Sequence, residues 1–278
     1  MIPTTALPDG TAVPVLGQGT WHVGEGERSR AEEVAALRLG ISLGLTLIDT
    51  AEMYGEGAAE EVVGEAIAGQ RDSVFVVSKV YPHNATRRGT IPACERSLKR
   101  LRTGHIDLYL LHWRGAAPLS ETVEQMEKLR AAGKIRHWGV SNLDTDDMEE
   151  LLAEGGAGCA ANQVLYNVEH RGIEFDLLPW QAGHRMPVMA YSPVGQGGRL
   201  LKHAVLGEIA RARGLTPAQV AIAWSLRVPG MISIPKATRA AHVRENAAAA
   251  SIVLEAGELA AIDAAFPPPG RKRSLAML

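Results

Sequence analysis

The feature that most constrains the fold is a repeated alternation between short apolar runs and longer segments with helical spacing. Apolar runs such as Leu45–Ile48, Val74–Lys79 and Ile106–His112 indicate buried strands, and each precedes a segment whose apolar residues recur every three or four positions. About eight such units extend over about 250 residues, the length typical of a barrel. The alternation therefore predicts an α/β fold, a (β/α)8 TIM barrel, with residues 1–278 forming a single domain.

Two additions to the barrel are expected. Asp9-Gly10, between short semi-apolar runs within residues 3–14, is a strong signal for a hairpin turn, so a small β-hairpin precedes the barrel. We take Val15–Leu16 as the first barrel strand. Later helical segments exceed one helix per strand, which predicts two auxiliary helices. Two helical segments follow the predicted strand Val188–Tyr191, one around residues 203–213 and one that opens at Thr216, with Pro217 at its first helical position.

The alternative fold is an open doubly wound sheet that binds a dinucleotide. Gly17-Gln18-Gly19 begins like the glycine-rich phosphate loop of such sheets, but His22 replaces its third glycine. The failed pattern weakens this alternative. It favours a simpler explanation, in which the two glycines let the backbone approach a neighbouring segment closely.

Overall charge and cysteine content exclude several functions. The formal net charge is −2, which offers no electrostatic basis for nucleic acid or an anionic membrane as a partner. Cys94 and Cys159 are too few for a disulfide framework, which indicates a reducing compartment. No apolar run approaches membrane length. We expect a cytoplasmic protein, with a monomer favoured over an oligomer.

Polar side chains stand at the ends of most predicted strands. Taken singly, each one is explained by a solvated charge, a helix cap or packing. In a barrel, however, the carboxyl ends of all strands face one pocket, so their convergence predicts an active site. These residues are Asp49 with Tyr54, Lys79, His112, Ser141 with Asn142, Gln163, Tyr191 with Ser192, and Lys236.

The side chains of Asp49, Tyr54, Lys79 and His112 suggest chemistry at a carbonyl group. A buried carboxylate needs a cation, and Lys79 on the next strand supplies one for Asp49. The same ammonium is expected to lower the pKa of Tyr54, which then acts as a proton donor. His112 can hold a substrate oxygen beside the phenol. These residues include a proton donor but no nucleophile, so reduction of a carbonyl is predicted, with the reducing equivalent supplied by a cofactor.

The remaining strand-end residues suit a nicotinamide. Ser141, Asn142 and Gln163 can bind a carboxamide, and Tyr191 offers an aromatic face. A metal site is the rival interpretation. No second histidine or cysteine stands at ligand spacing from His112, so we expect no metal.

The sequence resembles the aldo-keto reductases over nearly its whole length. Within that family it is most similar to bacterial methylglyoxal reductases, through Gly17–Trp21, Leu47–Tyr54 and Arg171–Trp180. The stretches that carry the family resemblance are Gly17–Trp21, Ile48–Gly55, Val77–Lys79, Asp107–Trp113, Gly139–Asn142, Gln163, Tyr191–Pro193, Ile234–Lys236 and Glu245–Asn246.

The resemblance implies a catalytic tetrad and an extended NADPH across the barrel mouth. The tetrad is Asp49, Tyr54, Lys79 and His112, with Tyr54 as general acid, and Trp21 and Trp113 line the substrate pocket beside Tyr54 and His112. The implied cofactor-binding residues are Gly19, Thr20, Trp21, Asp49, Ser141, Asn142, Gln163, Tyr191, Ser192, Val194, Gly195, Lys236, Ala237, Thr238, His242, Glu245 and Asn246.

The chain departs from the family pattern in its cofactor and loop regions. Many members carry serine at position 237 and arginine at position 242, where this chain has Ala237 and His242. Arginine binds phosphate as a two-pronged donor and neutral histidine does not. Because Lys236 remains, with Arg239 nearby, NADPH is preferred and NADH is the alternative. The segments after His112 and Tyr191 are short, which predicts an open pocket suited to small aldehydes.

These observations predict an NAD(P)H-dependent oxidoreductase that reduces aldehydes and ketones, such as methylglyoxal, to alcohols. Hydride comes from the nicotinamide and the proton comes from Tyr54. The partner is a small carbonyl compound. Two alternatives stay open: a nucleotide-sensing binding protein with negligible turnover, and a dehydrogenase that works mainly in the direction of alcohol oxidation.

Overall fold

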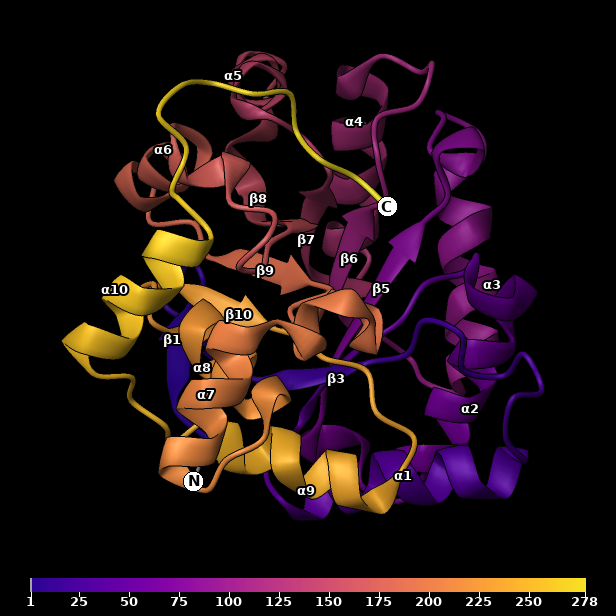
Figure 1. The fold of residues 1–278 in the computed structure, drawn as a ribbon. Helices are drawn as coiled ribbons and strands as arrows, with labels where there is room; N and C mark the ends of the chain where they lie inside the picture. Colours follow the sequence, from indigo (N-terminus) through magenta and orange to yellow (C-terminus); the bar gives the residue numbers. More distant parts are fainter. Residues whose placement is uncertain (1) are drawn as a thin grey trace.

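The computed structural model describes residues 2–278. A hairpin of β1 (Thr4–Ala6) and antiparallel β2 (Ala12–Pro14) comes first in the chain (Figure 1). Its turn is held by Asp9, whose carboxylate accepts a hydrogen bond from the backbone N–H of Thr11, and Gly10 adopts a φ of 92°. The expected N-terminal hairpin is confirmed.

Within residues 2–278 the main sheet has eight parallel strands, which follow one another around a barrel. Isolated bridges from Leu16 to Ser233 and from Gly19 to Lys236 join the first strand to the last and close it. The (β/α)8 barrel is confirmed, in place of the open sheet. The strands are β3 (Gly17–Gly19), β4 (Leu47–Asp49), β5 (Phe75–Val80), β6 (Ile106–Leu111), β7 (Ile135–Ser141), β8 (Cys159–Leu165), β9 (Val188–Tyr191) and β10 (Met231–Ser233).

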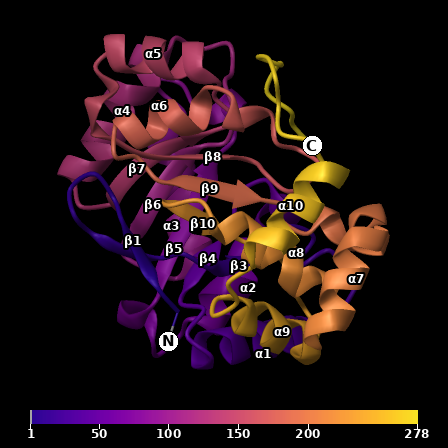
Figure 2. The ribbon, with the colours of Figure 1, turned by 60° about the vertical axis from the view of Figure 1, so that its left-hand side comes forward.

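Helices surround the barrel, and two segments of the described chain carry a pair of helices each: α7 and α8 between β9 and β10, and α9 and α10 after β10. Helices α7 and α10 contact each other outside the ring, as the expected auxiliary helices (Figure 2). The helices are α1 (Arg30–Ser42), α2 (Ala58–Ala66), α3 (Thr90–Leu101), α4 (Leu119–Ala131), α5 (Thr145–Ala153), α6 (Leu177–Gly183), α7 (Ala204–Arg213), α8 (Pro217–Leu226), α9 (Ala240–Ala249) and α10 (Ala256–Ala265).

The first barrel strand lies slightly later in the chain than Val15–Leu16, because β3 covers Gly17–Gly19. A Cβ atom on Gly17 would lie 2.5 Å from the Leu47 side chain, and one on Gly19 would lie 2.7 Å from the Ile234 carbonyl oxygen. Both glycines therefore let β3 fit between its two neighbours. This close approach within the barrel, rather than a phosphate loop, explains the glycine pattern.

Helix α6 is continuous from Leu177 to Gly183, although it contains Pro179. The proline lies in the first turn, where a backbone N–H has no partner within the helix, so no helical hydrogen bond is lost. Asp176 caps the helix by accepting a hydrogen bond from the Leu177 N–H.

The barrel interior is apolar at the end where the strands begin. Leu47, Val77 and Met189 belong to a buried cluster that also includes Leu7 and Val13 of the hairpin. The hairpin thus covers this end of the barrel, and polar strand ends are left at the other. Within residues 2–278, no helix combines the length and apolarity that a membrane crossing requires.

Candidate active site

Neighbouring strands bring three of the expected catalytic residues together. Asp49 is the last residue of β4, Lys79 lies one residue before the end of β5, and His112 directly follows β6. Because β4, β5 and β6 are adjacent and parallel, these side chains emerge at one end of the barrel. Tyr54 follows in the short loop after β4 and begins a 3-10 turn, Tyr54–Gly57.

The Lys79 ammonium makes three hydrogen bonds inside the barrel. Its Nζ lies 2.8 Å from Asp49 Oδ2, 2.9 Å from the Thr50 carbonyl oxygen and 3.1 Å from Tyr54 Oη. The Lys79 side chain is 0% exposed and that of Asp49 is 3% exposed. A buried ammonium is stable only when its N–H groups are hydrogen-bonded, and here three oxygen atoms accept those hydrogen bonds.

Two further contacts hold Asp49, and neither was expected in this role. Gln163 Nε2 donates to Asp49 Oδ1 at 2.7 Å, and Thr20 Oγ1 donates to the Asp49 carbonyl oxygen at 2.9 Å. Gln163 and Thr20 were both expected to bind the cofactor. In the structure, the Gln163 amide nitrogen and the Thr20 hydroxyl bind Asp49. Only closure of the barrel brings Gln163, on β8, to β4.

The expectation that Lys79 lowers the pKa of Tyr54 below its ordinary value is wrong for this structure. Removal of the phenol from water raises its pKa, and the nearby Asp49 carboxylate adds to the rise. The Lys79 charge opposes both effects without overcoming them. Tyr54 therefore remains protonated well into the alkaline range, in the form that donates a proton.

Lys79 stays charged. Burial lowers its pKa, but the Asp49 carboxylate and the Tyr54 hydroxyl oxygen favour the ammonium more strongly, so the pKa lies above the ordinary lysine value. Both hydrogen-bonded partners of this pair are thus protonated at neutral pH. The direction of the Lys79–Tyr54 hydrogen bond follows, with the ammonium as donor to the phenol oxygen.

His112 is neutral at any working pH. Burial, with a smaller contribution from the Lys79 charge, lowers its pKa to about 2. Within residues 2–278 its buried Nδ1 has no hydrogen-bond partner. A buried N–H without an acceptor is the less tolerated arrangement, which favours the tautomer with the proton on Nε2. In that tautomer Nε2 is the ring donor available to a substrate oxygen, beside Tyr54, whose ring centroid lies 5.6 Å away.

Aromatic rings extend from His112 to form one wall of the site. Trp113 lies 4.8 Å from His112 between ring centroids, and Tyr81 lies 5.2 Å from Trp113. Tyr81 was not among the expected site residues, although an aromatic residue directly after β5 was a usable signal. Trp21, the other expected wall residue, stacks on His22 at 4.3 Å.

The polar residues at the ends of β7 and β9 make hydrogen bonds with their neighbours in the structure. Asn142 Nδ2 donates to the His112 carbonyl oxygen at 3.2 Å, and Tyr191 Oη donates to Asn142 Oδ1 at 3.0 Å. Ser141 Oγ donates to the Gln163 carbonyl oxygen at 2.8 Å. Asn142 and Ser192 both have positive φ, 59° and 50°. Such strained backbone beside an active site is a common sign of function.

A second group lies where the barrel closes. Lys236 pairs across the β3–β10 junction with Gly19, and its Nζ lies 3.5 Å from Glu27 Oε2. Helix α9 starts a few residues later from Arg239, which makes no side-chain cap, so the first-turn N–H groups are available to an anion. The other expected cofactor residues lie on this helix, before it, or in the loop after β9: Ala237, Thr238, His242, Glu245, Asn246, Ser192, Val194 and Gly195.

Within residues 2–278 the structure has no cluster of three or more histidine, cysteine, aspartate or glutamate side chains that could hold a metal ion. Cys94 and Cys159 are both buried, and burial raises the pKa of each thiol to about 12.

Comparison with known families gives a match to the model of the Aldo/keto reductase family over residues 15–266. Among curated proteins, the chain is 57% identical to methylglyoxal reductase YeaE of Escherichia coli strain K12 over 272 residues, covering 96% of each chain. It is 34% identical to glyoxal reductase of Bacillus subtilis strain 168, over 94% of this chain and 92% of that protein.

The solved structures that resemble this chain include aldo/keto reductases as well. An aldo/keto reductase from Klebsiella pneumoniae, crystallised in complex with NADP and acetate, is 55% identical and superposes with a TM-score of 0.97, covering 100% of both chains. A second crystal structure from the same organism contains NADPH and matches equally well.

Proposed function

The chain belongs to the aldo/keto reductase family, and on that premise we propose that it is an NADPH-dependent reductase of aldehydes and ketones. Small aldehydes are the preferred substrates, with methylglyoxal the first to test, because the relative that shares 57% of its sequence is a methylglyoxal reductase. We also propose that the protein acts as a monomer of one domain in the cytoplasm.

The observation that carries the proposal is the contact of Lys79 Nζ with both Asp49 and Tyr54 Oη. The ammonium, fixed by the buried carboxylate, stabilises the negative charge that develops on the phenol oxygen as Tyr54 gives up its proton. The His112 N–H and the Tyr54 O–H converge on the carbonyl oxygen. A reduced nicotinamide bound beside this centre would supply the hydride to the carbonyl carbon, and Tyr54 donates the proton that completes the alcohol.

Donor groups suited to the cofactor stand on either side of this centre. The aromatic face of Tyr191 and the amide of Asn142 suit a nicotinamide ring. Lys236 and the uncapped start of α9 together suit a phosphate, since backbone N–H groups and an ammonium both favour negative charge. Glu27 competes with the 2′-phosphate of NADPH for Lys236. The preference of the site for NADPH over NADH, in binding affinity, is therefore smaller. The Klebsiella pneumoniae relatives that bind NADP and NADPH support NADPH as the cofactor.

The test is Tyr54→Phe, which keeps the ring and removes the proton. We expect NADPH affinity, measured by fluorescence titration, to stay within about twofold, while methylglyoxal reduction falls by about 10²- to 10⁴-fold. Loss of affinity and turnover together would show that Tyr54 builds the site rather than reacts in it. Full turnover in the variant would sink the proposed role.

A substrate panel run with NADPH and with NADH separates the proposal from its alternatives. Rapid oxidation of NADPH by small aldehydes is the expected outcome. Tight NADPH binding with no turnover on any carbonyl compound would identify a nucleotide-sensing protein. A kcat/KM higher for alcohol oxidation than for the matching aldehyde would identify a dehydrogenase.

A further inference from the structure

The residues after α10 form a strap across the mouth of the barrel. This C-terminal strap, residues 267–278, leaves α10, passes above α6 and α5, and turns back toward the strand ends (Figure 1). Its far end returns toward the strand ends (Figure 1), and the Leu278 backbone is near enough to the Tyr191 hydroxyl to lower the pKa of that phenol, which burial raises to about 12.

The root of the strap is fixed by a buried arginine. Arg171 Nη1 donates to the Phe266 carbonyl oxygen at 2.6 Å, at the point where the chain leaves α10. Three prolines follow, Pro267 to Pro269, and proline restricts the backbone to extended directions. The strap is therefore directed over the barrel rather than free to point into solvent.

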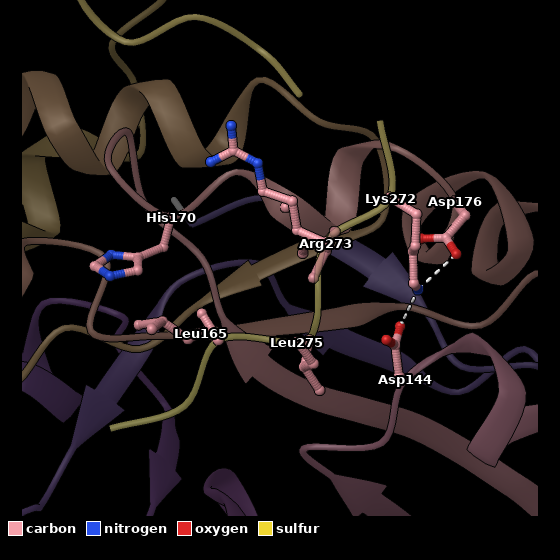
Figure 3. A pocket seen from close by; sticks show the side chains of 10 residues that line it. Asp144, Leu165, His170, Asp176, Lys272, Arg273 and Leu275 are labelled. Atoms are coloured by element: carbon pink, nitrogen blue, oxygen red, sulfur yellow. Dashed lines mark hydrogen bonds and ion pairs between the residues drawn. The ribbon is translucent and has the colours of Figure 1, made fainter. Parts of the chain in front are cut away.

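The middle of the strap is held by Lys272, whose ammonium sits between two carboxylates. Its Nζ lies 2.5 Å from Asp144 Oδ1 and 2.6 Å from Asp176 Oδ2 (Figure 3). Both carboxylates also cap helices: Asp144 accepts from the Thr145 N–H at the start of α5, and Asp176 accepts from the Leu177 N–H at the start of α6. Lys272 thus bridges the caps of the two helices that follow β7 and β8.

One apolar contact accompanies the ion pairs. Leu275 packs against the core and lines the same pocket as Leu165 and Ile173 (Figure 3). The contact area is small, since the strap residues on either side of Leu275 are exposed. The Lys272 side chain itself is 38% exposed, so its pairs are screened by solvent and salt. These contacts therefore define one closed position of the strap, and they are weak enough for the strap to open.

We propose that Lys272 is a positioning residue, a latch that holds the strap closed over the nicotinamide side of the barrel mouth and so slows cofactor exchange. The inference rests on the proposed function, because it takes Tyr191 as part of the nicotinamide site. With the latch closed, Leu278 lies beside Tyr191, and a cofactor that enters or leaves the mouth must displace the strap. Loss of the two half-exposed ion pairs of Lys272 should raise the fraction of molecules with an open strap by about three- to tenfold.

The experiment compares Lys272→Met with the conservative Lys272→Arg and with Arg271→Met, which removes an adjacent, exposed charge of the same strap. NADP⁺ release is followed by stopped-flow fluorescence, and exchange of the strap amides is followed by hydrogen–deuterium mass spectrometry. For Lys272→Met we expect release about three- to tenfold faster and strap amides that exchange faster. The other two variants should match the wild type.

The double variant Asp144→Asn/Asp176→Asn tests the partners without removing the caps, since asparagine caps helices as well as aspartate does. It should release NADP⁺ as fast as Lys272→Met, and adding Lys272→Met to it should have no further effect. If Lys272→Met loosens the strap but leaves the release rate unchanged, the latch is overturned while the proposed function stands. If the wild type does not bind NADPH at all, it is the proposed function that fails.

Discussion

Single side chains at this site have their protonation states set by burial as much as by their partners. Lys79 is surrounded by three oxygen acceptors and keeps its charge. The same charge acts on Tyr54 and His112, yet burial dominates both: the pKa of Tyr54 is raised and that of His112 falls to about 2. The site thus holds a neutral acid and a neutral donor around one buried cation.

The pH dependence of reduction follows from these directions. The reactive form needs Tyr54 protonated, and a raised pKa keeps it so beyond the ordinary tyrosine value of about 10. His112 is neutral above about pH 2, so its protonation does not lower the rate at moderately acidic pH. We expect the single-turnover rate of NADPH oxidation by an aldehyde to be flat between about pH 5 and pH 9. An alkaline fall with a midpoint below about pH 9 would show that Tyr54 has a lowered pKa in the working complex.

Much of the residue-level geometry was predictable because it depends on neighbouring strands. Asp49 and Lys79 end successive strands, so their pairing follows from the order of the chain. The contact of Gln163 with Asp49 joins strands on different parts of the barrel, and its register depends on how the whole sheet closes. The pKa of Tyr54 was mispredicted for a related reason, since sequence identifies the charge nearby but not the degree of burial.

Individual helices follow local sequence signals closely where those signals are complete. Helix α8 begins with Thr216, Pro217 and Gln219, and both bonds of the capping box form: Thr216 Oγ1 accepts from the Gln219 N–H, and Gln219 Oε1 accepts from the Thr216 N–H. Helix α9, by contrast, begins without a side-chain cap. An uncapped helix is less stable by itself, and its free N–H groups suit a bound phosphate.

Thr216→Ala tests the capping box of α8. It removes one acceptor from the helix start and should lower the free energy of unfolding by about 1 kcal/mol, because an N–H of the first turn loses its partner. Thr216→Ser keeps the hydroxyl and serves as the control. It should lower the free energy of unfolding by less than about 0.5 kcal/mol. The measurement is urea unfolding followed by circular dichroism. Identical midpoints for alanine and serine would contradict a stabilising cap.

Strand boundaries were harder to predict than helix boundaries. Val15–Leu16 has the apolar character of a strand, yet β3 covers Gly17–Gly19, because only glycine fits between the neighbouring strands at those positions. Leu47 and Ile234, which leave no room for a Cβ atom here, are far from β3 in the sequence. The glycines are therefore the only local sign of this requirement in the sequence. The same pair, seen alone, resembles a phosphate loop.

At the scale of the whole molecule, the barrel was predictable and the strap was not. The alternation of strand and helix is a periodic signal that extends through most of the chain. Residues 267–278 carry no periodicity, and their position depends on Arg171, Lys272 and two helix caps contributed by other segments. Interactions of this kind join the end of the chain to the loops after β7 and β8, and they decide how the barrel mouth is covered.

Arg171 is the residue on which the junction between α10 and the barrel most depends. Its side chain is 6% exposed and pairs with Glu174 and Asp263 in addition to the Phe266 carbonyl oxygen. Burial raises the pKa of Glu174, but the hydrogen bonds and charge of its partners, chiefly Arg171, outweigh that effect, so the pKa lies below the ordinary value. The pair therefore stabilises the fold at neutral pH, and this contribution is lost as the pH falls through the depressed pKa.

Arg171→Met keeps the apolar bulk but removes the charge that pairs with Glu174 and Asp263, and the partly buried Glu174 carboxylate is left with Arg227 as its remaining ion-pair partner. We expect the free energy of unfolding at pH 7 to fall by about 3 kcal/mol. The exposed Arg211 of α7 provides the matched control, and Arg211→Met should change it by less than about 0.5 kcal/mol. Urea unfolding at pH 7 and near pH 4 measures both. Because protonation of Glu174 removes the carboxylate charge that Arg171 neutralises, the difference between the variants should narrow in acid, and a difference independent of pH would mean that packing, not the ion pair, holds α10 in place.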